Sequence, residues 1–221
     1  MKQSRSLRAL GVFVCLFAIV FSVAGCKPLM TTAAVLIYGT EKPADWDGLR
    51  EKRVVVLCEP TSSFEYTAPT AARELARGVS ANLSQRVPGI EVVDYRRVAS
   101  WLDNGNNTWE TPDEIGKQFD ADVVVAIELG QYKLYEAQTL LRGQASALVQ
   151  VFDCSDQGQG NVLFERNIKV VYPPHTPVST SERTKNEFER MFNTVLADHV
   201  GRFFYRHDPS TDYYLDTDAL R

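Results

Sequence analysis

The stretch that decides the fold is VVVAIEL, residues 123–129. Its first five residues are apolar and most of them are β-branched, a pattern typical of a strand that is covered on both faces of a sheet. The residues before it, DAD at 120–122, are polar and favour a turn. We therefore expect residues 123–129 to form a central strand.

A second strand of the same character is expected upstream, where residues 54–58 read VVVLC. Between the two strands, residues 68–86 are predicted to form a helix, because Thr67 and Pro69 fit an amino-terminal cap and a first helical turn. Apolar residues recur there at every third or fourth position, so one face of this helix should pack on the sheet. That face consists of Ala72, Leu75, Ala76, Val79 and Leu83.

Three shorter elements are expected between this helix and the central strand. Residues 90–94 favour a strand, and residues 97–102 favour a short helix before a turn-rich loop. A further helix should begin at Thr111, because Thr111, Pro112 and Glu114 fit a cap, a proline in the first turn and an acidic residue three positions after the cap.

The last third of the chain predicts a β-hairpin and a long helix. Residues 144–153 alternate between apolar and polar side chains, and a polar turn with two glycines separates them from a returning strand at 162–171. Ser179, Thr180 or Ser181 is expected to cap the final helix. The spacing of large apolar residues predicts the buried face of that helix. The face consists of Phe188, Met191, Phe192, Val195, Leu196, His199, Val200 and Phe203.

Alternation of strands and helices is typical of α/β proteins. We expect an α/β fold in which a single sandwich domain, residues 53–206, packs helices on a mixed sheet of about four to five strands. Residues 207–221 would form an acidic tail, and nothing in the sequence marks a second domain.

The amino terminus predicts export from the cytoplasm. Lys2, Arg5 and Arg8 form a cationic start, and residues 9–21 then contain no charged residue. This pattern is typical of a signal peptide, and the apolar stretch is shorter than the ~20 residues that a membrane-spanning helix needs. Residues 23–26, which read VAGC, resemble the lipobox of bacterial lipoproteins.

The lipobox resemblance implies that residues 1–25 are removed as a signal peptide and that Cys26 carries lipid. Several acyl chains on one residue would hold the protein stably on a membrane. An ordinary signal peptide followed by a free cysteine is the alternative. Residues 26–52 would form a lipidated tether, and its apolar patch at 33–38 would either lie on the membrane or add a strand to the domain.

The charge of the chain argues against nucleic acid as a partner. The chain has 24 basic and 28 acidic residues, and loss of the cationic signal peptide makes it more acidic still. Nucleic-acid binding needs clustered Lys and Arg side chains to displace counterions, and the sequence has no such cluster.

Two cysteines remain for the folded body, Cys58 and Cys154. An oxidising compartment permits a disulfide between them, which is one hypothesis. Two separate buried thiols are the alternative. The sequence does not choose between the two.

A resemblance to a known group of domains emerges from this order of elements. Residues 115–122, IGKQFDAD, lead into the central strand, and a hairpin at 149–171 and an amphipathic helix follow. This arrangement is similar to the periplasmic α/β domain shared by the curli secretion lipoprotein, penicillin-binding-protein activator lipoproteins and the Tol-system amino-terminal domain. Asp120 departs from that pattern, which usually has glycine there to ease the end of the helix.

This resemblance implies a lipid-anchored accessory domain that binds another envelope protein and has no chemistry of its own. The anchor implies a periplasm-facing position in the cell envelope. Lys27 follows the lipobox cysteine where inner-membrane lipoproteins of some bacteria have aspartate, so analogy favours the outer membrane.

The sequence contains no motif for catalysis, metal binding or a cofactor. His199 lies on the apolar face of the last helix, where a core histidine is expected, and the spacing of the histidines does not fit a metal site. Serine-nucleophile elbows and phosphate-binding loops are absent. Asp94, Asp122 and Glu128 lie near predicted strand ends, where α/β proteins often place their sites.

Two hypotheses follow for the function. The first is a non-enzymatic envelope protein that docks on a partner protein or self-associates. The second is a periplasmic lipoprotein that binds or hydrolyses a small ligand in a crevice between strand ends and the loop at 60–69.

Overall fold

The computed structural model describes residues 41–61, 69–104, 111–155 and 160–209. The chain divides into two compact units, Met1–Glu41 and Lys42–Arg221. Of the first unit only Glu41 is described, so Cys26 and the patch at 33–38 lie outside the described residues. Within the described ranges, no helix is both long enough and apolar enough to cross a bilayer.

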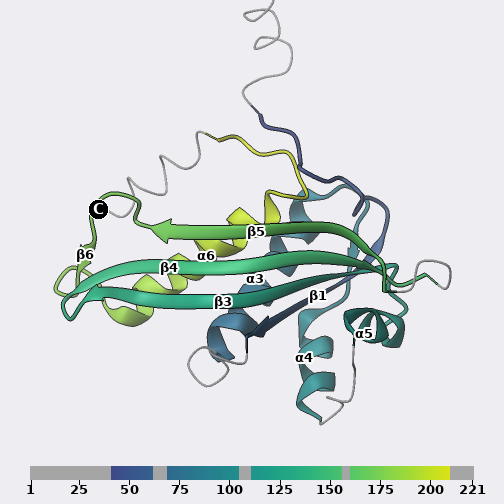
Figure 1. The fold of residues 1–221 in the computed structure, drawn as a ribbon, viewed down its shortest axis with the longest axis horizontal. Coiled ribbons are helices and arrows are strands. Elements are labelled where there is room, and N and C mark those ends of the chain that lie inside the picture. Colours follow the sequence, from purple (N-terminus) through teal and green to yellow (C-terminus); the bar gives the residue numbers. More distant parts are fainter. Residues whose placement is uncertain (1–40, 62–68, 105–110, 156–159, 210–221) are drawn as a thin grey trace, which may run out of the picture. The chain divides into compact units, whose positions relative to one another are not determined.

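Strands and helices follow one another nearly in the predicted order (Figure 1). The elements are β1 (Arg53–Pro60), α3 (Pro69–Arg86), β2 (Glu91–Val92), α4 (Tyr95–Asp103), α5 (Pro112–Gln118), β3 (Val123–Ala137), β4 (Leu140–Asp153), β5 (Val162–Tyr172), β6 (Val178–Ser179) and α6 (Lys185–Gly201).

The strands form one mixed sheet in the order β2-β1-β3-β4-β5, and β6 pairs with β4. β1 runs parallel to β2 and to β3, whereas β3, β4 and β5 are successively antiparallel. The predicted α/β class is thus confirmed, and the predicted central strand lies in the middle of the sheet. The sheet has six strands because it includes two strands of only two residues each.

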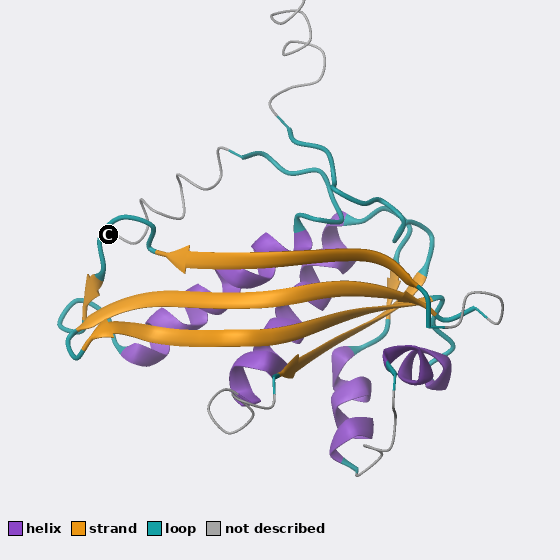
Figure 2. Cartoon of the chain, in the orientation of Figure 1, coloured by secondary structure: helices purple, strands orange, loops and turns teal. Residues whose placement is uncertain are grey.

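Helices cover the two faces of the sheet unequally (Figure 2). α3 and α6 pack against each other and on one face, where Leu75, Ile127 and Phe188 belong to the large core. α4 and α5 pack on the opposite face, mainly over β1 and β3, around Ile115 and Val124. Each such fully buried large side chain contributes roughly 1.5–3 kcal/mol.

β3 and β4 are longer than the sequence predicted. β3 continues to Ala137 and pairs with β4 from Leu140, so these strands form a hairpin before the predicted one. The ladder has register shifts after Leu129 and on both sides of Tyr135. Such shifts break the two-residue alternation by which a strand is recognised, so the pattern did not indicate this hairpin.

Thr184 caps α6, so the prediction of Ser179, Thr180 or Ser181 was wrong. Thr184 Oγ1 accepts the Glu187 backbone N–H at 3.3 Å, and Glu187 Oε2 accepts the Thr184 backbone N–H at 3.0 Å. This reciprocal pair is a capping box. Ser179 cannot start the helix because it pairs with β4 as part of β6.

Residues 42–52, which the sequence assigned to the tether, are packed on the domain. Leu49 is fully buried in the core. Trp46 stacks on Phe164 with 5.9 Å between ring centroids. Lys42 forms an antiparallel bridge with His207, a residue that was assigned to the tail. The mainly polar composition of this segment gave no sign of its packing.

Candidate binding surfaces

On one face of the antiparallel half of the sheet, α5 contacts β3 and the end of β4 near Cys154, and no described helix packs on β5 (Figure 2). Along β4, side chains that face α3 and α6 are buried, and the intervening ones are half-buried and mostly polar. We call this surface the open face. It consists of Gln144, Ser146, Leu148 and Gln150 of β4 and of Glu165, Asn167, Lys169 and Val171 of β5.

β5 forms an edge of the sheet, and no described strand pairs with its outer side. The strand is 11 residues long. Val162, Leu163 and Val171 on it are 47%, 41% and 45% exposed. Natural edge strands are usually short, charged or covered. β5 carries the charged residues Glu165, Arg166 and Lys169, but its length and its exposed apolar side chains make it a candidate contact surface. The predicted hairpin placed these residues in a strand, but sequence does not show which strand ends the sheet.

A cavity of about 210 Å³ opens beside the carboxyl end of β1. β2 pairs only with the first two residues of β1, so α3 and α4 line the rest of that edge. The walls are largely apolar, and Ala76 and Leu102 are typical of them. Cys58 and Tyr95 add a thiol and a phenol, and burial raises the pKa of both groups, so both stay protonated at neutral pH.

An ion pair contributes charge to the lining of this cavity. Arg73 of α3 and Asp103 of α4 approach within 2.7 Å and both line the cavity. More than half of each side chain is exposed, so the pair contributes little to stability. A crevice at this strand end was expected from the sequence, although the loop at 62–68 lies outside the described residues.

The acids that the sequence singled out do not converge on one site. Asp94 caps α4 and accepts a backbone N–H at 2.8 Å. Asp122 accepts the backbone N–H of Arg53 at 2.7 Å, which ties the starts of β1 and β3 together. Glu128 lies opposite Glu59 in the β1–β3 register, and both line a second hollow of about 290 Å³.

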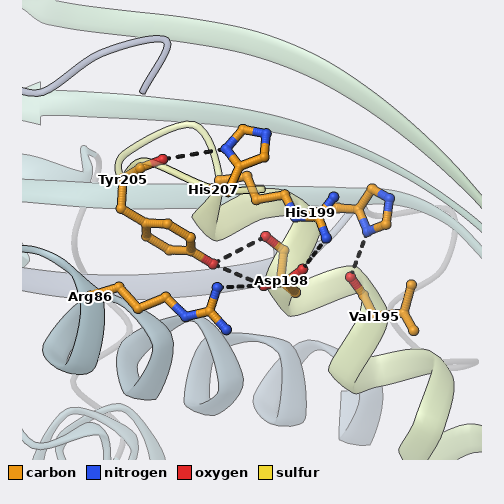
Figure 3. Close-up of polar contacts among 7 residues, drawn as sticks. Arg86, Val195, Asp198, His199, Tyr205 and His207 are labelled. Atoms are coloured by element: carbon orange, nitrogen blue, oxygen red, sulfur yellow. Dashed lines mark hydrogen bonds and ion pairs between the residues drawn. The ribbon is translucent and has the colours of Figure 1, made fainter. Parts of the chain in front are cut away.

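Two of the three histidines, His199 and His207, bond to backbone groups near them in sequence (Figure 3). His199 Nδ1–H donates to the Val195 carbonyl at 2.9 Å within α6, and His207 Nδ1–H donates to the Tyr205 carbonyl at 3.4 Å. In the described part of the chain, no group of three or more His, Cys, Asp and Glu side chains is arranged to hold a metal ion.

Asp198 joins α3, α6 and the segment after α6 (Figure 3). Its carboxylate lies 3.3 Å from the Arg86 guanidinium and 2.7 Å from that of Arg202, and it accepts the Tyr205 hydroxyl at 3.0 Å. Burial, together with the Asp198 charge, raises the pKa of Tyr205, so this phenol stays a neutral donor. We interpret this cluster as structural, because every charged group in it faces an opposite charge.

Cys58 and Cys154 are free thiols in the structure, and Cys154 is buried whereas Cys58 is partly buried. In the sheet register Cys58 pairs with Ile127, whereas the Cys154 backbone N–H donates to Asp122. Asp122, which immediately precedes β3, and Ile127 are roughly 16 Å apart at the usual rise of a strand, so the two thiols lie farther apart in the structure than a disulfide spans. Burial and nearby acids raise the pKa of Cys154 to about 11.

Comparison with known proteins gives no family. No protein-family model and no curated protein sequence matches this chain. Among solved structures, it is similar to lipoprotein GNA1162 from Neisseria meningitidis, with 13% identity over 66% of this chain and 96% of that one and a TM-score of 0.42. The PelC dodecamer from Paraburkholderia phytofirmans gives 10% identity over 76% and 96%, with a TM-score of 0.45.

The carboxy-terminal domain of LpoB from Salmonella enterica gives 10% identity over 55% of this chain and 83% of that domain, with a TM-score of 0.38. A bacterial lipoprotein is thus among the structures that the chain resembles. Values of this size carry no conclusion about its function.

Proposed function

We propose that this protein is a lipid-anchored accessory protein of the bacterial cell envelope, which binds another envelope protein or a second copy of itself and catalyses no reaction. Lipid on Cys26 would hold it on a membrane, with its domain facing the periplasm. Lys27 favours the outer membrane over the inner one, because it stands where inner-membrane lipoproteins of some bacteria have aspartate.

The observation that carries this proposal is the open face together with the outer side of β5. The described helices cover β5 on one face only, α5 reaches just the end of β4 on the other face, and β5 exposes Val162, Leu163 and Val171. A partner could add a strand to this edge or lay a surface across the open face, and both are recurring modes of protein recognition.

The roles of the candidate catalytic groups support a non-enzymatic function. Asp94 and Asp122 are engaged in holding helix and strand ends. His199 bonds within its own helix. These bonds give the three side chains structural roles, whereas Glu128 lines the second hollow together with Glu59.

Site-specific photo-crosslinking in living cells tests the proposal. A photoreactive amino acid in place of Leu148, at the centre of the open face, should trap a discrete protein. The same amino acid in place of the exposed Arg77 on α3 is the matched control and should trap little. Equal crosslinking at the two positions, or none at either, would contradict docking through this surface.

The cavity beside β1 favours a second candidate function, the binding of a small apolar ligand. Its apolar walls with one thiol and one phenol suit a ligand with a single polar group. An apolar fluorescent probe such as N-phenyl-1-naphthylamine should bind the wild type. Ala76→Leu should weaken binding by filling the cavity, whereas Arg77→Leu should not. Unchanged probe binding in Ala76→Leu would dispose of this candidate.

A further inference from the structure

β5 carries a row of exposed side chains whose charges are complementary to those of the same strand read in the opposite direction. From one end to the other the pattern is apolar, acidic, amide, basic and apolar, and it is centred on Asn167. The residues in this order are Leu163, Glu165, Asn167, Lys169 and Val171. All five side chains are exposed, and Leu163 lies at the register shift of the β4–β5 ladder, where it has no facing residue on β4.

Such a strand is complementary to a second copy of itself. If two β5 strands meet antiparallel about a two-fold axis at Asn167, Glu165 of each copy lies opposite Lys169 of the other. Leu163 then lies opposite Val171, and Asn167 opposite Asn167. Opposite charges and apolar side chains in directly facing positions stabilise antiparallel strands.

The pattern also selects this register against its neighbours. A slip that moves the axis to Glu165 places two carboxylates opposite each other, and a slip to Lys169 places two ammonium groups opposite each other. Like charges in facing positions are destabilising. A slip that moves the axis by one residue, to Arg166 or Ile168, would bring Asn167 opposite Glu165 or Lys169 and would lose the attraction between opposite charges.

The other side of β5 does not oppose this pairing. Arg166 faces the helix-covered side, where it lies 3.8 Å from Asp45, and Trp46 stacks on Phe164 there. The backbone of that segment bonds elsewhere, since the Trp46 N–H donates to the Phe203 carbonyl. Among the described residues, the outward backbone groups of β5 therefore have no strand partner.

We propose that β5 pairs antiparallel with β5 of a second copy of this chain, which joins two sheets into one continuous sheet with a two-fold axis at Asn167. This pairing rests on the proposed docking function, and it identifies the docking partner as a second copy of the chain. The choice of a second copy follows from the complementary charges of Glu165 and Lys169. Isologous pairing of one patch with itself is the commonest symmetry of soluble oligomers. Confinement of both copies to one membrane would raise their effective concentration.

Cysteine crosslinking of the full-length protein in intact membranes tests the register. Facing residues of antiparallel strands have Cα atoms about 4.5–5.5 Å apart, within the range of a disulfide. Asn167→Cys should therefore give a disulfide-linked dimer after mild oxidation. Arg77→Cys, on the exposed side of α3, is the control and should not.

Two further variants separate a specific register from random collision. Glu165→Cys alone and Lys169→Cys alone should not crosslink, because each faces the other position in the second copy. Co-expression of the two variants should give the crosslinked dimer. The proposal is overturned if Asn167→Cys crosslinks no better than Arg77→Cys, or if Glu165→Cys alone crosslinks as well as the co-expressed pair.

Charge reversal gives an independent measurement by analytical ultracentrifugation of the full chain in detergent. Glu165→Lys and Lys169→Glu should each weaken self-association about tenfold, since two attractive pairs become two repulsive ones. A mixture of the two variants should associate as the wild type does. Association that is unchanged by either reversal would overturn the inference.

These outcomes are distinguishable from failure of the proposed function. If β5 does not self-pair but photo-crosslinking at Leu148 still traps another protein, only the identity of the partner is wrong. If both measurements are negative, the docking function fails as well.

Discussion

Asp198 shows how single residues hold this fold together. Its carboxylate faces two guanidinium groups, of which that of Arg202 is 9% exposed and that of Arg86 is 49% exposed. We expect Asp198→Ala to lower the free energy of unfolding by about 2–4 kcal/mol, because it removes the carboxylate that compensates the buried Arg202 charge. Arg86→Ala should lower it by less than about 1 kcal/mol. Urea unfolding measures both, and equal effects of the two variants would contradict this account.

The two thiols give a second prediction at this scale. Because burial raises the pKa of Cys58 and that of Cys154, both should be mainly protonated at pH 8 and slow to alkylate in the native protein. In urea, both should alkylate without reductant. Mass spectrometry of the alkylated protein checks this, and alkylation of the native protein at the rate of an exposed thiol would contradict it.

The environment of a single residue could be predicted from the sequence where it depends on neighbours in the same element. His199 was expected on the buried face of its helix, and it is half-buried and bonded within the helix. Whether Cys58 and Cys154 could pair depends on the sheet register, which brings together residues far apart in sequence. No local pattern carries that register.

At the scale of elements, the capping box of α6 gives a prediction that depends on pH. Glu187 accepts the backbone N–H and the hydroxyl of Thr184, and these bonds lower the pKa of Glu187 below its ordinary value of 4.5. A carboxyl group with a lowered pKa in the folded state stabilises it above the unfolded-state pKa. That contribution is lost as the pH falls through the folded-state value.

Thr184→Ala should therefore lower the free energy of unfolding by about 1 kcal/mol at neutral pH. The difference from wild type should shrink as the pH is lowered through the pKa of Glu187. Thr194→Ala, in the same helix but away from the cap, is the control and should show no such pH dependence. Thermal unfolding between pH 7 and pH 3 provides the measurement, and a constant difference across this range would contradict the role of the capping box.

Most elements could be predicted because their signals are local. The runs at 54–58 and 123–129 are continuous and β-branched, and the stripe of α6 is long and regular. The β3–β4 hairpin was missed because its register shifts interrupt the alternation. The place of β5 at the edge of the sheet could not be predicted, since strand order depends on how distant segments pair.

At the scale of the whole molecule, the account depends on the lipid anchor. Cys26→Ala should abolish labelling with a radioactive fatty acid, because the residue that would carry the lipid is removed. It should also release the protein from membranes, because several acyl chains on this residue would be what holds it there. Cys15→Ala, within the predicted signal peptide, should keep both labelling and membrane retention. Fractionation of cells that express each variant checks this, and retention of Cys26→Ala on membranes would count against the anchor.

Docking through the open face and the outer side of β5 is the central claim. The most direct test is the ratio of photo-crosslinked product at Leu148 to that at Arg77, measured in living cells for the anchored protein. We predict a discrete crosslinked species at Leu148 and little or none at Arg77. Comparable products at both positions would contradict the claim, since the helix-covered side would then meet partners as readily as the open face.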